Sequence, residues 1–176
     1  MTETLTVDQV PTILDSAVRQ IQFARDYTLE LLEATPKSDW FVIPEGLPTN
    51  VAWQVGHLAV SQYGLLMFRI RGRDPDDLDL IPSRFRKAYS RQSTPSASQD
   101  KQPSAEELLE RLDEVHQRAM GELAKVEAKT LLEAVEMPYA AYPNKLGAVL
   151  FCSLHEQIHA GHVGLIRRAI GLDPVR

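Results

Sequence analysis

The sequence contains a single cysteine, and this scarcity limits the chemistry available to the chain. Cys152 is the only thiol among 176 residues, so no intramolecular disulfide can form. A chain of this length typically buries roughly 70% of its unfolded surface on folding, so it needs no disulfide for stability. A lone cysteine fits a reducing environment, and we expect a cytoplasmic protein.

Long apolar runs and an excess of basic charge are also missing. No apolar stretch reaches the ~20 residues that a helix needs to span a bilayer. The first ten residues, MTETLTVDQV, lack the basic start and apolar core of a signal peptide. The formal net charge is −5, with 19 basic and 24 acidic side chains. We therefore expect neither a membrane nor a nucleic acid as a partner.

What the sequence does contain is helical periodicity in four segments. Apolar residues recur at helical spacing in residues 8–35, 50–71, 104–123 and 145–170. Asp8 is predicted to cap the first helix, and Ser104 with Glu107 forms a capping box for the third. Gly171 suits the end of the last helix. Because no segment shows a convincing strand pattern, the sequence predicts an all-α protein, a four-helix bundle in one domain over residues 1–176.

The connection between the second and third helices is unusually long. Residues 72–103 are polar and rich in Pro, Ser, Asp and Gln. A structureless loop of this length is uncommon in a compact domain. We therefore expect a crossover along the bundle, partly helical near residues 77–90, rather than a linker between domains.

Three histidines lie on one face of the last predicted helix. At about 100° per residue, His155, His159 and His162 fall within an arc of about 60°. A bundle helix usually fills that stripe with Leu or Val, and burying one unpaired polar group costs about 1–3 kcal/mol. Three such groups indicate a shared partner. Side chains at i and i+4 can reach one metal ion, so His155 and His159 are candidate ligands.

A third ligand has to come from another helix, because one helical face cannot close a tetrahedral site. His57 on the second helix is the best candidate, since Gly56 and Gly64 would permit another helix to approach closely. We therefore predict one divalent metal ion held by His57, His155 and His159. Zn²⁺ is the first expectation, with Ni²⁺ and Fe²⁺ as alternatives, because imidazole suits all three.

The remaining candidates have weaker signals. His162 would be a hydrogen-bond donor behind a metal ligand or a substrate contact, with a fourth metal ligand as the alternative, and it is one of two candidate proton carriers. Glu156 would be the other candidate proton carrier of a catalytic site. His116 is expected to be an ordinary half-buried histidine of the third helix, and Cys152 a small buried side chain.

The sequence HEQIH at residues 155–159 also matches the H-E-x-x-H pattern of zinc peptidases, in which the glutamate is the general base. The usual completions of that pattern are missing. The extended form needs Gly at position 162 and His at 165, where this chain has His162 and Leu165. Asp173 is the only acidic residue after Glu156, so no downstream glutamate ligand exists. A peptidase is therefore the less favoured interpretation.

Taken together, the motifs resemble those of the DinB/YfiT superfamily. They are WQVGHLA at residues 53–59, HEQIHAGH at 155–162 and IRRAIG at 166–171. The resemblance covers nearly the whole chain and implies an up-down-down-up bundle whose metal site is His57, His155 and His159. One departure is His162, where members of the superfamily often have Gln.

The resemblance also implies a chemistry. Characterised members include metal-dependent transferases and isomerases that use low-molecular-weight thiols such as mycothiol or bacillithiol, so a small thiol or another small substrate is the expected partner. It further implies a homodimer. The alternative is a non-catalytic metal-binding protein of stress response or regulation, and only a substrate pocket over the metal would separate the two.

Overall fold

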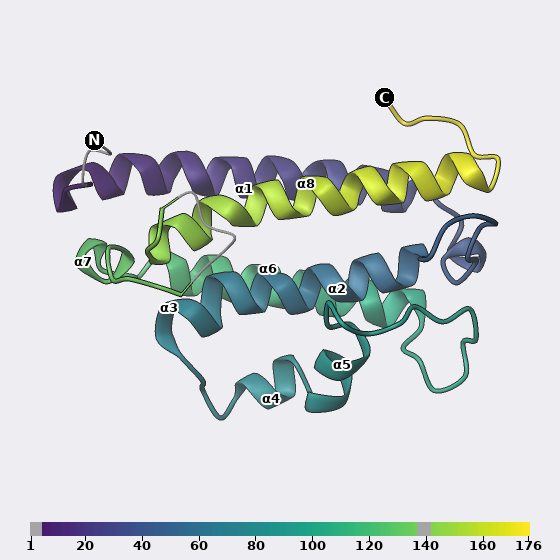
Figure 1. Ribbon diagram of the computed structural model, residues 1–176, viewed down its shortest axis with the longest axis horizontal. Coiled ribbons are helices and arrows are strands. Elements are labelled where there is room, and N and C mark those ends of the chain that lie inside the picture. The colour runs from purple at the N-terminus through teal and green to yellow at the C-terminus, as the bar shows by residue number, and fades with distance from the viewer. Residues whose placement is uncertain (1–4, 137–141) are drawn as a thin grey trace.

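The computed structural model describes residues 5–136 and 142–176, and its architecture is all-α (Figure 1). Four main helices pack together: α1 (Val10–Glu33), α2 (Val51–Tyr63), α6 (Ala105–Leu123) and α8 (Lys145–Ala169). Helix α8 packs along α1, α2 packs along α6, and α2 also contacts α8. The predicted all-α class and the four helices are confirmed.

The second predicted helix is one continuous rod built from three pieces. Helix α2 continues through a π-helical turn, η3 (Gly64–Phe68), into α3 (Arg69–Arg71). The side chain of Asn50 caps its first turn by accepting a hydrogen bond from the amide of Trp53 at 2.9 Å. π-helical turns often occur at functional sites because they re-aim the side chains around them.

The other helix ends follow local capping chemistry, with one correction. Ser104 and Glu107 form the predicted capping box of α6, and Gly171 follows α8 with a φ of +87°. The prediction that Asp8 caps the first helix is wrong. Asp8 lies inside a 3₁₀ turn, η1 (Val7–Gln9), which runs directly into α1, and Thr6 caps that turn.

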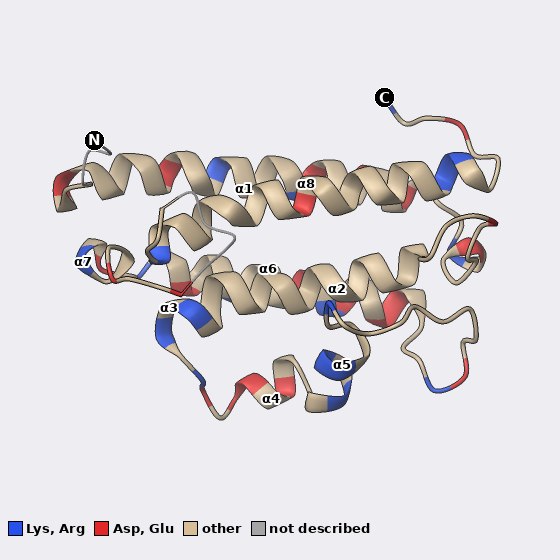
Figure 2. Cartoon of the chain, viewed as in Figure 1, with Lys and Arg blue, Asp and Glu red and all other residues tan. Residues whose placement is uncertain are grey.

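The long connection between α3 and α6, called the crossover below, is partly helical, as predicted. After α3 the chain forms α4 (Asp77–Leu80) and α5 (Ser83–Ala88) and then reaches α6. Acidic residues on α4 are followed by basic residues on α5, and both signs are spread over the rest of the chain (Figure 2). Two short elements, η2 (Lys37–Asp39) and α7 (Ala128–Leu131), occupy other connections. Within the described ranges, no helix is long and apolar enough to cross a membrane.

Helix α8 is buried on two sides. Ala160 and Arg167 lie on the side away from the histidines. In the structure both are buried, because this side of α8 packs on α1. The guanidinium of Arg167 donates to the hydroxyl of Thr35 at 2.8 Å and to the carbonyl of Ala34, at the end of α1. The histidine side of α8 faces α2.

Candidate metal centre

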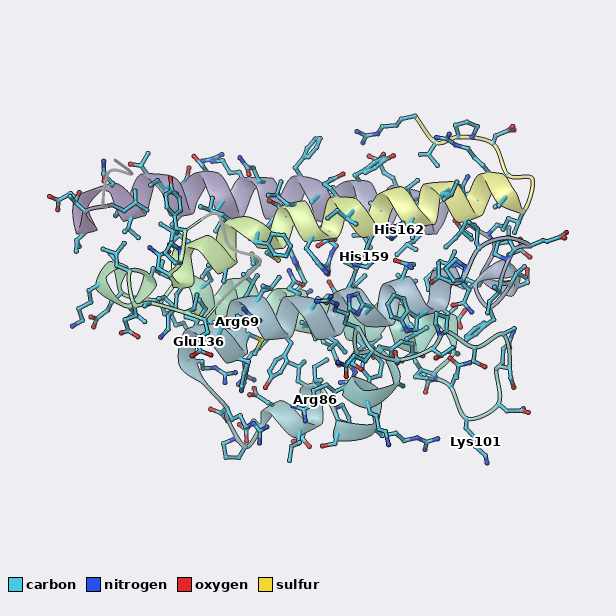
Figure 3. The ribbon with its side chains drawn as sticks, in the orientation of Figure 1. Arg69, Arg86, Lys101, Glu136, His159 and His162 are labelled. Carbon is cyan, nitrogen blue, oxygen red and sulfur yellow. The ribbon has the colours of Figure 1, made fainter. Side chains whose placement is uncertain are left out.

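The structure brings His57, His155 and His159 together, from α2 and α8. One ring nitrogen of each lies within 4.8 Å of those of the other two. His57 and His159 are 6% and 8% exposed, and His155 is half-buried. In Figure 3 the side chain of His159 extends from α8 toward α2. This is the grouping that the sequence predicts as a metal site.

The orientation of His57 is set by a residue of the crossover. Its Nδ1–H donates to the main-chain carbonyl of Tyr89 at 2.8 Å, since a carbonyl can only accept. Its Nε2 is therefore the unprotonated nitrogen of the neutral ring and accepts from the Ser61 hydroxyl at 3.2 Å. The indole of Trp53 stacks on the imidazole, with centroids 4.7 Å apart and planes 6° from parallel. The ring is thus held in one orientation with Nε2 unprotonated, and a metal ion bound there would replace the Ser61 hydroxyl.

His159 is held in the same way by a side-chain amide. Its Nδ1 lies 2.5 Å from Oε1 of Gln54. The Gln54 amide group is oriented by its own donation to the Thr49 hydroxyl at 2.8 Å, which leaves Oε1 to accept from His159. The Nε2 of His159 then faces the Nε2 of His155 at 3.2 Å.

These residues fit a divalent metal ion. Histidine ligands usually donate their second ring N–H to a carbonyl or carboxylate, as His57 and His159 do here. Two ligands at about 2.05 Å from a tetrahedral ion lie roughly 3.3 Å apart, close to the separation of the Nε2 atoms of His155 and His159.

The protonation state of the rings also fits. Burial lowers the pKa of His57 below its ordinary value. Burial, together with the neighbouring rings, lowers the pKa of His155 to about 4 and that of His159 to about 2. All three imidazoles are therefore neutral near pH 7, the form that binds metals.

A pocket of about 550 Å³ opens above the three histidines. Its walls are mainly apolar, from Trp53, Leu65, Phe151 and Ile158. His162 also lines it, with its ring edge-on to that of His159 at 5.5 Å between centroids. A cavity with apolar walls and a few converging polar groups is the usual form of a small-molecule site.

Glu156, the other candidate proton carrier, faces a different part of the bundle. Its carboxylate is 2% exposed and accepts from Nε of Arg25 at 2.6 Å and from Nη2 at 3.2 Å. Arg25 also donates to the side chain of Gln62 at 2.9 Å. Glu156 therefore lies in a buried ion pair with α1 and is not among the residues that line the pocket. The catalytic roles of Glu156 and His162 stay predictions.

His116 and Cys152, which were not expected to belong to the site, are both buried. His116 is buried on α6, with its ring nitrogens 3.0 Å from the amide nitrogen of Gln62 and 3.2 Å from the amide oxygen of Gln22. It is not part of the three-histidine group. Cys152 is buried as expected, and burial raises the pKa of its thiol far above the ordinary value. Cys152 is not part of the three-histidine group, and a buried thiol that resists ionisation is a poor nucleophile.

Sequence reasoning missed the two residues that orient the ligands. Gln54 had a detectable signal, because it is a polar residue within a helix that is apolar on most of its circumference. Tyr89 had no detectable signal in the sequence, because it orients His57 through its main-chain carbonyl, which every residue type has. Gly56 was expected to permit close approach of a helix. Instead the Tyr89 ring fills that space, and a Cβ at Gly56 would lie 2.3 Å from it.

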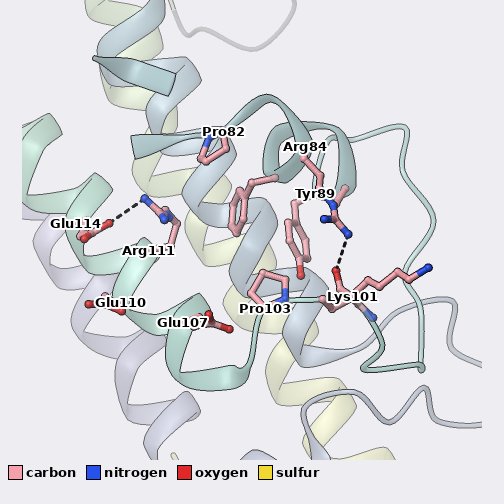
Figure 4. Close-up of a pocket in the computed structure, with 12 residues that line it drawn as sticks. Pro82, Arg84, Tyr89, Lys101, Pro103, Glu107, Glu110, Arg111 and Glu114 are labelled. Carbon is pink, nitrogen blue, oxygen red and sulfur yellow. Dashed lines mark hydrogen bonds and ion pairs between the residues drawn. The ribbon is translucent and has the colours of Figure 1, made fainter. Parts of the chain in front are cut away.

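The other face of the Tyr89 segment borders a second pocket, of about 600 Å³ (Figure 4). It lies between α5 and the first turns of α6, and none of the three histidines lines it. Its rim carries charges of both signs, including Arg111, which donates to Glu114 at 3.0 Å. This pocket is larger than the one over the histidines, but it holds no comparable group of metal-binding side chains among the described residues.

Comparison with known protein families gives a match over most of this chain. The family model described as DinB superfamily matches residues 20–163. This range runs from within α1 to within α8 and includes all three histidines. No curated protein matches the sequence.

Proposed function

This chain belongs to the DinB superfamily, and from that premise we propose that it binds one divalent transition metal ion and uses it to activate a small thiol. His57, His155 and His159 are the proposed ligands, and Zn²⁺ is the proposed metal, because neutral imidazoles suit it and the ligand separation suits a tetrahedral site. The reaction would be attack of the thiolate on an electrophilic carbon of a second small substrate, with departure of the leaving group on that carbon, or an isomerisation in which the thiol adds to the substrate and then departs.

One observation carries this proposal: buried hydrogen-bond acceptors of the protein hold two of the three imidazoles in a fixed orientation. The carbonyl of Tyr89 and the amide oxygen of Gln54 take the Nδ1 protons of His57 and His159. This leaves Nε2 of both rings unprotonated, and one ring nitrogen of each of the three histidines lies within 4.8 Å of those of the other two. Partners of this kind fix the tautomer and typically contribute 10–100-fold in metal affinity.

The ion would supply a positive charge that lowers the pKa of a thiol bound beside it. The chain supplies the surroundings. Trp53 and Phe151 contribute apolar walls to the pocket, which would strengthen electrostatic attraction for a thiolate bound against them. Three neutral ligands leave the full charge of the ion uncompensated, which favours an anionic reactant.

Of the two predicted proton carriers, we assign the transfer to His162. It lines the pocket and is exposed, so it can exchange protons with solvent. Glu156 is occupied by Arg25 and does not line the pocket. That arrangement also counts against the peptidase interpretation, which needs this glutamate as the base beside the metal.

We also propose the up-down-down-up order for the bundle. The packing of α1 on α8 and of α2 on α6, with the crossover between α3 and α6, supports it (Figure 1). In this order the two helices that carry the histidines, α2 and α8, run in opposite directions.

A spectroscopic titration tests the proposed chemistry. Addition of a small thiol such as 2-mercaptoethanol to the Co²⁺-loaded protein should produce a thiolate-to-cobalt charge-transfer band in the near ultraviolet. The His162→Gln protein should keep the band but require a higher pH to reach half of it. A metal-loaded protein that gives no such band with any small thiol would favour a metal-binding protein without thiol chemistry, and the proposal would be wrong.

A further inference from the structure

The charged residues of the metal pocket are all of one sign. Among the described residues that line it, Arg69 and Arg91 are the only charged ones, and no carboxylate is present. They come from separate elements, Arg69 from α3 at the end of the π-helical turn and Arg91 from the crossover after α5. The two guanidinium groups therefore contribute positive charge to the pocket in addition to that of a metal ion.

Arg69 is partly withdrawn from water. It is half-buried, and burial lowers its pKa below the ordinary value. A guanidinium that has lost part of its hydration is stabilised by an anion, and it binds a carboxylate through two parallel hydrogen bonds. Arg69 and Arg91 each make an interaction within the protein as well, so a ligand would share these side chains.

Arg91 lies where the metal pocket meets a neighbouring one. A second pocket, of about 420 Å³, shares Trp53, Arg91, His159 and His162 with the metal pocket. A ligand whose donor atom reaches the histidines thus has room to extend toward a cation, along apolar walls that include Leu65 and Phe151. The walls of the pocket thus include the three histidines, apolar side chains and two guanidinium groups.

We propose that this pocket selects a thiol that carries a carboxylate at the far end of a short apolar chain, and that Arg69 and Arg91 recognise the carboxylate. The inference rests on the proposed function, because the thiol is the group expected at the metal. It adds the charge of the substrate, which the three histidines do not determine.

Pairs of ligands that differ only in charge test this inference. The Co²⁺-loaded protein is titrated with ω-mercaptocarboxylates of three, four and six carbons and with the corresponding neutral amides, and the charge-transfer band gives each dissociation constant. For at least one chain length, the carboxylate should bind about tenfold more tightly than its amide, roughly 1.4 kcal/mol. If the amide and the carboxylate had nearly equal dissociation constants at every chain length, the inference would be overturned.

Variants of Arg69 and Arg91 test whether these two residues cause the preference for the carboxylate over the amide. Arg69→Gln and Arg91→Gln should each reduce the ratio at least threefold, and the double variant should bring it close to one. Arg168→Gln is the matched control, because Arg168 is exposed on α8 away from the pocket and its loss changes the net charge equally. A ratio that persists in the double variant would mean that the metal ion itself, rather than the arginines, selects the anion.

A thiol-free readout separates this inference from the proposed function. Hexanoate and hexanamide are compared by calorimetric titration of the Zn²⁺-loaded protein and of the double variant. If no thiol produces a band but hexanoate binds in an arginine-dependent way, the thiol chemistry is wrong and the anion site stands. Equal or undetectable binding of both compounds would overturn the anion site.

Discussion

Nδ1 of His57 donates a hydrogen bond to the main-chain carbonyl of Tyr89 at 2.8 Å, while the Tyr89 ring packs against Gly56, the residue just before His57. One residue of the crossover therefore contacts the second helix twice at the metal site. The ring fixes the position of the segment, and the carbonyl fixes the tautomer of the histidine. The long connection is thus part of the site, although it contributes no ligand.

Gly56→Ala should disturb this contact and weaken metal binding. The new Cβ would lie 2.3–2.7 Å from three atoms of the Tyr89 ring, so the ring has to move and the carbonyl moves with it. Overpacking of this kind costs about 1–3 kcal/mol, which exceeds or cancels the helix-propensity gain of about 1 kcal/mol from Gly to Ala. We expect metal affinity to fall about 10–100-fold, measured by competition with a chromophoric chelator.

Gly121→Ala is the control for that variant. Gly121 lies in α6 with open space where its Cβ would go, so the same change should stabilise the protein by about 0.5–1 kcal/mol and leave metal affinity unchanged. Equal metal affinity in the two variants would show that Tyr89 does not position His57.

Each of the three histidines should be needed for full metal content. Because His57, His155 and His159 come from two helices and converge within 4.8 Å, replacing any one with Ala removes a third of the ligand set. Elemental analysis of the purified variants should show a sharp loss of metal. His116→Ala should retain the metal, since His116 lies outside the group. Full metal content in His57→Ala would refute a site shared between helices.

Glu156→Gln should destabilise the fold rather than change a chemical step. The variant leaves the Arg25 guanidinium, whose side chain is 3% exposed, without its charge partner. Breaking a buried ion pair by removing one partner typically costs 3–5 kcal/mol. Urea unfolding should therefore give a markedly lower midpoint, with metal content preserved in the folded protein. A variant as stable as the wild type that has lost only catalysis would instead give Glu156 the role of a base.

Acid should weaken the crossover through Asp77. Burial by itself would raise the pKa of Asp77, but hydrogen bonds from Arg71, the amide of Asp74 and the hydroxyl of Tyr63 outweigh it and lower the pKa to about 2. In the unfolded chain the pKa is about 3.9. The stabilisation is therefore complete above about pH 4 and is lost as the pH falls toward 2.

Asp77→Asn tests this acid dependence. The variant should be less stable at pH 7 by about 1–3 kcal/mol, because charged hydrogen bonds are lost, and the difference from the wild type should shrink between pH 4 and pH 2. Thermal unfolding followed by circular dichroism across that range measures it. A difference that stays constant with pH would assign the loss to packing alone.

The sequence by itself determined the features that depend on neighbours in the chain. The end of α8 follows from Gly171 and the start of α6 from Ser104 and Glu107, because caps act within one turn. The pairing of His155 with His159 follows from helical spacing, since residues four apart lie one above the other. His57 could be chosen as the third member because Gly56 and Gly64 would permit a close helix approach, although the Tyr89 ring fills the space at Gly56.

Only the tertiary structure decided how the helices are rotated against one another and what surrounds each ligand. Glu156 is next to His155 in sequence, yet α8 packs so that its carboxylate meets Arg25 of α1 while the histidines face α2. The carbonyl of Tyr89 accepts from His57, which lies 32 positions earlier in the sequence. The crossover that carries Tyr89 has no sequence motif that would predict this contact. Helical periodicity gives the angle between side chains on one helix, but the contacts between helices depend on packing that no local pattern records.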